Sequence, residues 1–267
     1  MTEVDLRHGD CIDVLKTLPA GSVDSVVTSP PYAMQRASTY GGIPEKDYPE
    51  WTVAWMQEVW RVLKDDGSVI INIRPHIRNG QISDYVLRTR MALREAGGCE
   101  LEELIWHKKG GAPLGSIHRP RRTWESLLWF GKHGRVYCDP KAAGQVSERV
   151  GGLQWGRTGP HISNKQNATR TGIARVPDVL EMSTRLNANS NGLNDHPAPF
   201  PWQLAEWCGK LITPPGGTIL DPFTGSSSTG VAAIKNGWNF IGIDQSAEYI
   251  ELSRKRLETA SADGGLF

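Results

Sequence analysis

The sequence lacks the features that mark membrane-spanning, secreted and disulfide-bonded proteins. Its 267 residues contain no apolar run of about 18 residues, the minimum that crosses a bilayer. The first ten residues are too polar for a signal peptide. The cysteines form neither a CxxC pair nor a disulfide-rich pattern; they are Cys11, Cys99, Cys138 and Cys208. We therefore expect a cytoplasmic protein with reduced thiols, no membrane partner and no zinc or other metal site.

An excess of either charge is also missing. Thirty Lys and Arg against 29 Asp and Glu give a net charge of +1, which excludes a histone-like protein and an acidic solvating tail. The positive charge is concentrated in two segments. Residues 133–177 hold seven basic and two acidic side chains, a net charge of +5, and residues 107–122 hold five basic and no acidic ones. Two such segments on a nearly neutral chain indicate binding to phosphates.

Short β-branched or aliphatic runs alternate with amphipathic segments along most of the chain. This pattern predicts an α/β fold with a mostly parallel sheet and crossover helices. The length and an apolar content of 39% fit one large domain, or a domain with an insertion. The expected strands are Val23–Thr28, Ser68–Ile73, Leu101–Trp106, Ser126–Phe130, Thr218–Asp221 and Phe240–Asp244.

Three helices are expected from apolar residues spaced about one turn apart. Trp55, Val59 and Leu63 predict the first, which we expect to end at Asp66-Gly67 because glycine is common just past a helix. The other two carry Leu204, Cys208 and Leu211, and Ile250 and Leu257 with Ser246 as the N-cap.

Residues 133–177 break this pattern, because they lack periodicity and are dominated by Gly, Asn, Gln, Ser and Thr. A loop of this length without structure of its own is uncommon in a compact domain. The segment is therefore an inserted subdomain, a segment that becomes ordered on a ligand, or a surface insertion without a role.

A polar turn, Thr28-Ser29-Pro30-Pro31-Tyr32, directly follows the first expected strand. In open α/β sheets, ligands bind beyond the carboxyl ends of strands. Two prolines fix two φ angles and remove two N–H donors, so the turn presents carbonyls and the Ser29 hydroxyl as acceptors beside an aromatic ring. This arrangement suits an amino group on a flat ring, whereas Pro-Pro alone would indicate only a rigid turn.

A second loop, from Asp221 to Gly230, follows another expected strand and precedes a helical pattern. Its small residues allow a close approach of the backbone to a ligand. It is not a P-loop, because Val231 stands where the lysine belongs, and it is not the dinucleotide GxGxxG motif. Asp244 ends the next strand, where a carboxylate can accept ribose hydroxyls. Together these features predict a nucleoside site without a phosphate cradle, which disfavours a nicotinamide enzyme.

In this order the motifs resemble the β-class S-adenosylmethionine-dependent DNA amino-methyltransferases, over nearly the whole chain outside residues 133–195. Ser29-Pro30-Pro31-Tyr32 is similar to the catalytic motif of that family. Residues 221–230 are similar to its cofactor loop, with Phe223 in the usual aromatic place and Ser227 where many members have glycine. Asp244 matches the acid that binds the ribose.

The resemblance also implies roles for weaker motifs. Gly9-Asp10-Cys11 resembles the segment whose Asp holds the adenine amino group, and residues 196–201 resemble the motif at the methionine end, with Phe200 where several members have lysine. Residues 121–125 resemble a segment that usually reads His-Glu at its end. The implied cofactor residues are Asp10, Cys11, Thr28, His196, Phe200, Asp221, Pro222, Phe223, Thr224, Gly225, Ser226, Ser227 and Asp244.

The resemblance implies a Rossmann-like methyltransferase fold with a permuted motif order. Residues 1–132 would form the catalytic part, 133–195 a target-recognition insertion and 196–267 the cofactor-binding part. Double-stranded DNA is the implied partner, a homodimer and a partner restriction nuclease are further expectations, and S-adenosylmethionine is the implied cofactor. The residues expected to contact DNA are Lys108, Lys109, Arg119, Arg121, Arg122, Arg157, Lys165 and Arg170.

The implied chemistry is direct methyl transfer to an exocyclic amine of a flipped base. The Ser29 hydroxyl and the Pro30 carbonyl would hold the two N–H groups, and Tyr32 would stack on the base. Within the family Ser-Pro-Pro-Tyr is commoner in N4-cytosine enzymes and Asp-Pro-Pro-Tyr in N6-adenine enzymes. We therefore expect N4-cytosine as the target, with N6-adenine as the alternative. A protein or small-molecule methyltransferase and a DNA-binding module without activity are more distant alternatives.

Overall fold

The computed structural model describes residues 2–34, 42–110, 118–144, 154–156, 159–161, 172–183 and 200–263. Four of the site residues expected above lie outside this part of the chain; they are Arg157, Lys165, Arg170 and His196. Among the described helices, none is long and apolar enough to cross a membrane.

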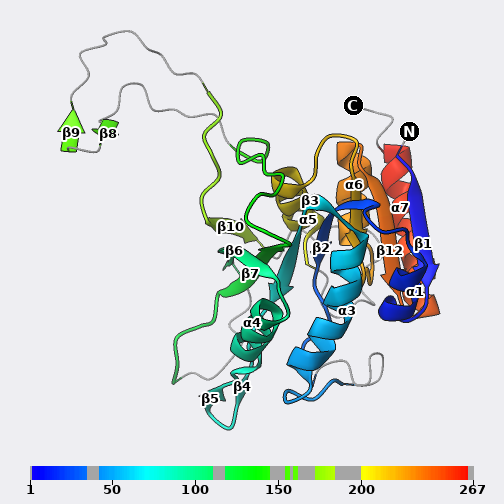
Figure 1. The fold of residues 1–267 in the computed structure, drawn as a ribbon, viewed down its shortest axis with the longest axis horizontal. Coiled ribbons are helices and arrows are strands. Elements are labelled where there is room, and N and C mark those ends of the chain that lie inside the picture. The colour runs from blue at the N-terminus through cyan, green and yellow to red at the C-terminus, as the bar shows by residue number, and fades with distance from the viewer. Residues whose placement is uncertain are drawn as a thin grey trace.

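An eight-stranded sheet forms the centre of the molecule (Figure 1). Its order is β1-β12-β11-β2-β3-β7-β6-β10, and every neighbouring pair is parallel except the two that β7 forms with β3 and β6. The strands are β1 (Val4–His8), β2 (Val23–Thr28), β3 (Leu63–Ile73), β6 (Cys99–Lys109), β7 (Trp124–Gly131), β10 (Val179–Ser183), β11 (Thr218–Asp221) and β12 (Asn239–Asp244). The mostly parallel sheet that the sequence predicts is therefore confirmed.

Two further pairs of short strands form small sheets of their own. The first joins β4 (Ile77–Arg78) to β5 (Gln81–Ile82), and the second joins β8 (Gln154–Gly156) to β9 (Gly159–His161), both antiparallel.

Helices cover both faces of the main sheet and bury two separate apolar cores. On one face lie α1 (Cys11–Thr17), α3 (Tyr48–Val62) and α4 (Tyr85–Glu95), and on the other α5 (Trp202–Ile212), α6 (Ser228–Asn236) and α7 (Ala247–Asp263). Successive residues of β3 alternate between them, since Ile71 packs in the first core and Ile70 in the second. Two covered faces explain why every residue of β2 is buried, including the polar Asp24, Ser25 and Thr28.

All six expected strands are present, with ends that differ by up to five residues. The three expected helices are also present. Leu204, Cys208 and Leu211 are buried on α5, and Ser246 caps α7 by accepting the backbone N–H of Tyr249.

The expected end of α3 at Asp66-Gly67 is wrong. The helix ends at Val62, and Leu63 is already extended and pairs with Val23 of β2. Gly67 does not end a helix. It allows β3 to pack closely against β2, because a Cβ there would lie 2.7 Å from the backbone oxygen of Asp24.

Part of the range expected to be a recognition insertion, 133–195, belongs to the main sheet. Strand β10 pairs in parallel with β6 along its whole length. Upstream of it, the backbone N–H of Tyr137 donates to Asp66 and that of Asp139 donates to Leu211. The main domain therefore continues on both sides of the segment around β8 and β9.

The order of the strands places β2 and β11 side by side at the centre of the sheet. From β2 the chain passes through α3 to β3 on one side, whereas from β11 it passes through α6 to β12 on the other. The point where connections diverge in this way is where open α/β sheets bind ligands, beyond the carboxyl ends of the strands.

Candidate active site

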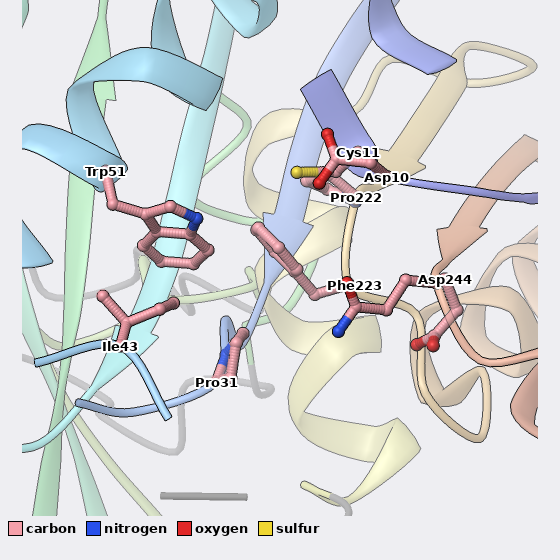
Figure 2. A pocket seen from close by; sticks show the side chains of 9 residues that line it. Asp10, Cys11, Pro31, Ile43, Trp51, Pro222, Phe223 and Asp244 are labelled. Atoms are coloured by element: carbon pink, nitrogen blue, oxygen red, sulfur yellow. The ribbon is translucent and has the colours of Figure 1, made fainter. Parts of the chain in front are cut away.

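A cavity lies at this divergence point, between the two loops that follow β2 and β11 (Figure 2). Counted with its open mouth, its volume is about 540 Å³, which is within the range of small-molecule sites. Its lining residues are Asp10, Cys11, Pro31, Ile43, Trp51, Pro222, Phe223, Asp244 and Gln245. The structure thus brings together residues from four motifs that are separated along the chain.

Asp244 stands at the end of β12 and has its carboxylate fixed by backbone donors. Oδ2 accepts the N–H of Gly225 at 2.9 Å, and Oδ1 accepts that of Ser246 at 2.8 Å. A carboxylate accepts hydrogen bonds at either oxygen and donates none. Its chemistry therefore fits an acceptor for ribose hydroxyls.

Asp10 is the second carboxylate of the cavity and is also the N-cap of α1. Its Oδ1 accepts the backbone N–H groups of Ile12 at 2.9 Å and Asp13 at 3.4 Å. The cap fixes this side chain at the rim of the cavity, where a carboxylate suits a ligand amino group.

An aromatic pair forms the apolar wall of the cavity. The ring centroids of Trp51 and Phe223 are 5.4 Å apart, and Phe223 is also supported edge-on by the buried Trp55. In Figure 2, Trp51 and Ile43 lie opposite Asp244, with Phe223 between them. One apolar wall and two carboxylates fit an adenosine group, with the base against the rings and the ribose at the acid.

Cys11 lines the same cavity as a buried thiol. Burial, followed by the neighbouring Asp10, raises its pKa to about 12. The thiol therefore stays protonated and acts as a small apolar neighbour, not as a nucleophile.

Asp221 is placed behind the cofactor loop and not at the cavity surface. Its oxygens accept the hydroxyls of Thr28 at 2.7 Å and Thr229 at 2.8 Å, and the N–H of Phe223 at 3.1 Å. These bonds tie the end of β2, the loop and the start of α6 together. Asp221 thus holds the two site-forming loops in register.

Other expected cofactor residues also build the loop from behind. Thr224, Ser226 and Ser227 are buried, and the hydroxyls of Thr224 and Ser227 are 2.9 Å apart. Ser227 adopts a left-handed conformation, with φ of +61°, which explains why glycine suits this position in the resembling family. Phe200 packs against the core on the α5 side, and its carbonyl accepts the Ser228 hydroxyl.

The catalytic motif adjoins the cavity and continues into a polar network. Pro31 lines the cavity, whereas the Tyr32 hydroxyl donates to Glu125 Oε2 at 2.9 Å. Asn72 Nδ2 lies 2.9 Å from the same oxygen, 3.3 Å from the Tyr32 hydroxyl and 3.5 Å from Ser29 Oγ. A single buried carboxylate therefore holds Tyr32 directly and Ser29 only through Asn72.

Besides Ile43 and Gln245 of the cavity lining, three residues of the site are not among those expected from the sequence. Trp51 stands on an amphipathic helix, where its spacing from Trp55 indicates packing alone. Asn72 is the last residue but one of β3, and Glu125 stands in a segment whose resemblance to the family is weak. Only the second of these positions, a polar residue at the carboxyl end of a central strand, carried a signal that sequence reasoning could have used.

The basic residues of segment 107–122 are less available than the sequence suggests. Lys108 pairs with the buried Glu125, and Lys109 pairs with Glu181 at 2.6 Å. The carboxylates come from β7 and β10, so the absence of acids within the segment does not make it uniformly positive in space.

The arginines of this segment lie nearer to the surface. Arg119 is exposed and donates to the carbonyl of Gly80, and Arg122 donates to that of Pro75. Partial burial, and then the neighbouring Arg74, lower the pKa of Arg122. The guanidinium groups of Arg74 and Arg122 are therefore close neighbours, and they concentrate positive charge at this point.

Comparison with known proteins identifies the family. A family model for DNA methylases of the N6/N4 type matches residues 23–255, which is most of the chain. The chain therefore belongs to this family of DNA methyltransferases, and the resemblance inferred from its motifs is confirmed. Its methyl donor is S-adenosylmethionine, as the resemblance implies.

Two curated relatives show the spread within the family. The type II methyltransferase M.PvuII of Proteus hauseri is 27% identical over 277 residues, covering 93% of this chain and 82% of its own length. The DNA adenine methyltransferase YhdJ of Escherichia coli K12 is also 27% identical, covering 95% of this chain and 82% of its own. The family therefore does not by itself identify the target base.

Solved structures confirm the fold. The PvuII cytosine-N4-specific DNA methyltransferase matches with a TM-score of 0.74 and 23% identity, covering 99% of this chain and 92% of that one. A protein of Thermus thermophilus described as a DNA modification methylase, solved with S-adenosylmethionine, matches with a TM-score of 0.64 and 22% identity, covering 97% and 96%. The predicted methyltransferase fold is thus correct.

Proposed function

We propose that this protein is a site-specific DNA methyltransferase that acts on the exocyclic N4 amine of cytosine in duplex DNA. The observation that carries the proposal is the position of Ser29-Pro30-Pro31-Tyr32, which adjoins a cavity suited to adenosine at the carboxyl ends of β2 and β11. The serine at the first motif position supports cytosine, as does the similarity to an enzyme named as cytosine-N4-specific.

S-adenosylmethionine supplies an electrophilic methyl group when it is bound. Asp244 would hold the ribose, Asp10 the adenine amino group, and Phe223 and Trp51 the face of the adenine. Each of these roles follows from the donor and acceptor chemistry of the cavity lining.

The catalytic motif would act on the target amine by holding its hydrogens. The amine is a poor nucleophile, because its lone pair is delocalised into the ring. Acceptors at the Ser29 hydroxyl and the Pro30 carbonyl would orient the two N–H groups and aim the lone pair, so that proximity and orientation supply most of the rate. Stacking on Tyr32, about 1–3 kcal/mol, would offset the few kcal/mol that base flipping costs.

N6-adenine is the second candidate target, because a relative of equal identity is named as an adenine methyltransferase. Adenine and cytosine both offer an exocyclic amine with two hydrogens, so the same acceptors would serve either base.

For the DNA contacts, we propose that Arg119, Arg121 and Arg122 hold phosphates and that residues 133–195 include the target-reading segment. Several relatives are named as type II methyltransferases, which supports a partner restriction nuclease.

Methyl transfer and cofactor binding can be separated by substitution. We expect Ser29→Ala and Tyr32→Ala to lower the turnover of labelled S-adenosylmethionine on unmethylated duplex DNA by at least tenfold, because each removes a contact to the target base. The dissociation constant for S-adenosylmethionine, measured by calorimetry, should stay within threefold of the wild type. Equal losses in both measurements would contradict the assignment of this motif to the target base.

A further inference from the structure

Glu125 is a buried carboxylate in the catalytic site that the chemistry proposed above does not use. It is 5% exposed and stands on β7, between Asn72 on β3 and Lys108 on β6. Every one of its hydrogen bonds described above goes to a residue of the catalytic site or to Lys108. A charge taken out of water costs several kcal/mol unless it is paired, so this position needs a reason.

The first consequence of Glu125 is the orientation of Tyr32. The Tyr32 hydroxyl donates to Glu125 Oε2, and burial, followed by the charge of Glu125, raises the pKa of Tyr32 well above its usual value. The hydroxyl therefore stays protonated and remains a donor. One directed bond at the tip of the ring limits the positions that the ring face can adopt toward a base.

The second consequence is the orientation of the Asn72 amide. A carboxylate is an acceptor only, so the amide must turn its nitrogen toward Glu125 Oε2. The same nitrogen is then within reach of the Tyr32 hydroxyl and Ser29 Oγ. The amide oxygen Oδ1 is buried without a partner among the described residues, which is unfavourable for folding. Asn72 thus keeps an orientation that stability alone does not favour.

The third element is Lys108, which pairs with Glu125 Oε1 and lies over the ring of Trp106, 4.6 Å from its centroid. Its side chain is 19% exposed, against 72% for Lys109 next to it. The Lys108 ammonium is therefore oriented into the site, where it pairs with the Glu125 carboxylate, whereas Lys109 pairs with Glu181 at the surface.

We propose that Glu125 is a positioning residue for methyl transfer, paired with Lys108, and that it aligns Tyr32 directly and Ser29 through Asn72. The inference rests on the proposed function, and it moves Lys108 from the expected DNA contacts into the catalytic site. Glu125 itself touches neither the cofactor nor the target amine in this account.

The test compares turnover, cofactor binding and DNA binding in the full-length protein. Unmethylated genomic DNA from a methylation-deficient host serves as substrate, with labelled S-adenosylmethionine as donor. The variants are Glu125→Gln, Lys108→Met, Lys108→Arg and the double variant Lys108→Met/Glu125→Gln. Glu181→Gln is the matched control, because Glu181 also pairs with a lysine of β6 but is half exposed.

We expect Glu125→Gln to lower kcat at least 30-fold while KM for S-adenosylmethionine stays within threefold. Lys108→Arg, which keeps the charge, should retain turnover within fivefold, and Glu181→Gln should match the wild type. The double variant should be no worse than Glu125→Gln within threefold, because the pair acts as one unit. Lys108→Met alone leaves a buried carboxylate unpaired and can therefore unfold the protein. The double variant has neither charge, so it tests the loss of Lys108 in a folded protein.

Two results would overturn the inference while leaving the proposed function intact. One is an active wild type with a Glu125→Gln variant of equal kcat. The other concerns the slope of the logarithm of the DNA-binding constant against the logarithm of the salt concentration. A slope smaller in magnitude by about one in the double variant would mean that Lys108 contacts a phosphate. A wild type that transfers no methyl group to DNA would instead overturn the proposed function and this inference with it.

Discussion

Asp221 illustrates how a single side chain supports the site without touching a ligand. It is buried, and its carboxylate accepts from two threonine hydroxyls and one backbone N–H. Burial outweighs these donors, which act in the opposite direction, and raises its pKa to about 6 from an ordinary 3.8. The charge is thus kept at neutral pH at a cost in stability.

The pH dependence of stability should reveal this cost. Because the folded-state pKa lies above the unfolded one, the folded state binds more protons between pH 4 and pH 6, and stability increases as the pH falls through 6. When the pH is lowered from 7 to 5, the protonation of Asp221 should increase the free energy of unfolding by about 1 kcal/mol. Asp221→Asn should lose this increment in urea unfolding at the two pH values. An identical pH dependence in both proteins would contradict the raised pKa.

Asp244 should contribute to cofactor affinity through its hydrogen bonds. Asp244→Ala removes a charged acceptor, so we expect S-adenosylmethionine to bind more weakly by about 1.5–3 kcal/mol, measured by calorimetry. Asp13→Ala is a suitable comparison, because Asp13 is an exposed acid on α1 that pairs with Lys16. Unchanged binding by Asp244→Ala would mean that another group holds the ribose.

For individual residues, the sequence predicts the lining of the cavity better than the hydrogen-bond network around Glu125. Six of the nine lining residues were expected. Pro31, Pro222, Phe223 and Asp244 stand at the ends of expected strands, whereas Asp10 and Cys11 were implied by the family resemblance. Glu125 and Lys108 could not be paired in advance, since they come together only through the antiparallel register of β6 and β7. Sequence order does not contain that register.

For the helices and strands, packing in the folded protein overrides the local sequence pattern at several positions. The apolar spacing continues through Leu63, but this residue pairs with β2 and is fully buried, so the strand begins where the helix was expected to continue. The edge strands β1 and β10 were not predicted, because each is only partly buried and mixes polar with apolar residues. Helix α4 was missed because its buried face includes the polar Thr89, while the apolar Leu87 and Met91 are exposed.

The packing of α5 against the sheet yields a stability prediction. A Cβ at Gly209 would lie 2.5 Å from Trp238 Cζ3 and 2.7 Å from Cη2, and Trp238 is buried. We therefore expect Gly209→Ala to lower the free energy of unfolding by about 1–3 kcal/mol, despite the higher helix propensity of alanine. Gly134→Ala, where nothing lies within 4 Å, should change it by less than about 0.5 kcal/mol. Equal changes in the free energy of unfolding for the two variants, measured in urea, would show that the Trp238 ring moves to make room for the added methyl group.

At the scale of the whole molecule, the two loops that carry the chemistry are brought together by the strand order. Residues 29–32 and 221–230 are nearly 190 residues apart, yet Thr28 Oγ1 and Asp221 Oδ1 are 2.7 Å apart because β2 and β11 are neighbours. The chain can therefore place its catalytic motif first and its cofactor loop last and still form one site. Order along the sequence matters less than order in the sheet.

The central claim is that this site methylates an exocyclic amine of DNA, and the product tests it most directly. The protein would be expressed in a host that lacks DNA methylation, and the hydrolysed genomic DNA analysed by mass spectrometry, with Ser29→Ala as the comparison. We expect N4-methylcytosine with the wild type and at least a tenfold lower level with the variant. N6-methyladenine would contradict the proposed base alone, and the absence of any methylated nucleoside, from folded protein that binds S-adenosylmethionine, would contradict the central claim.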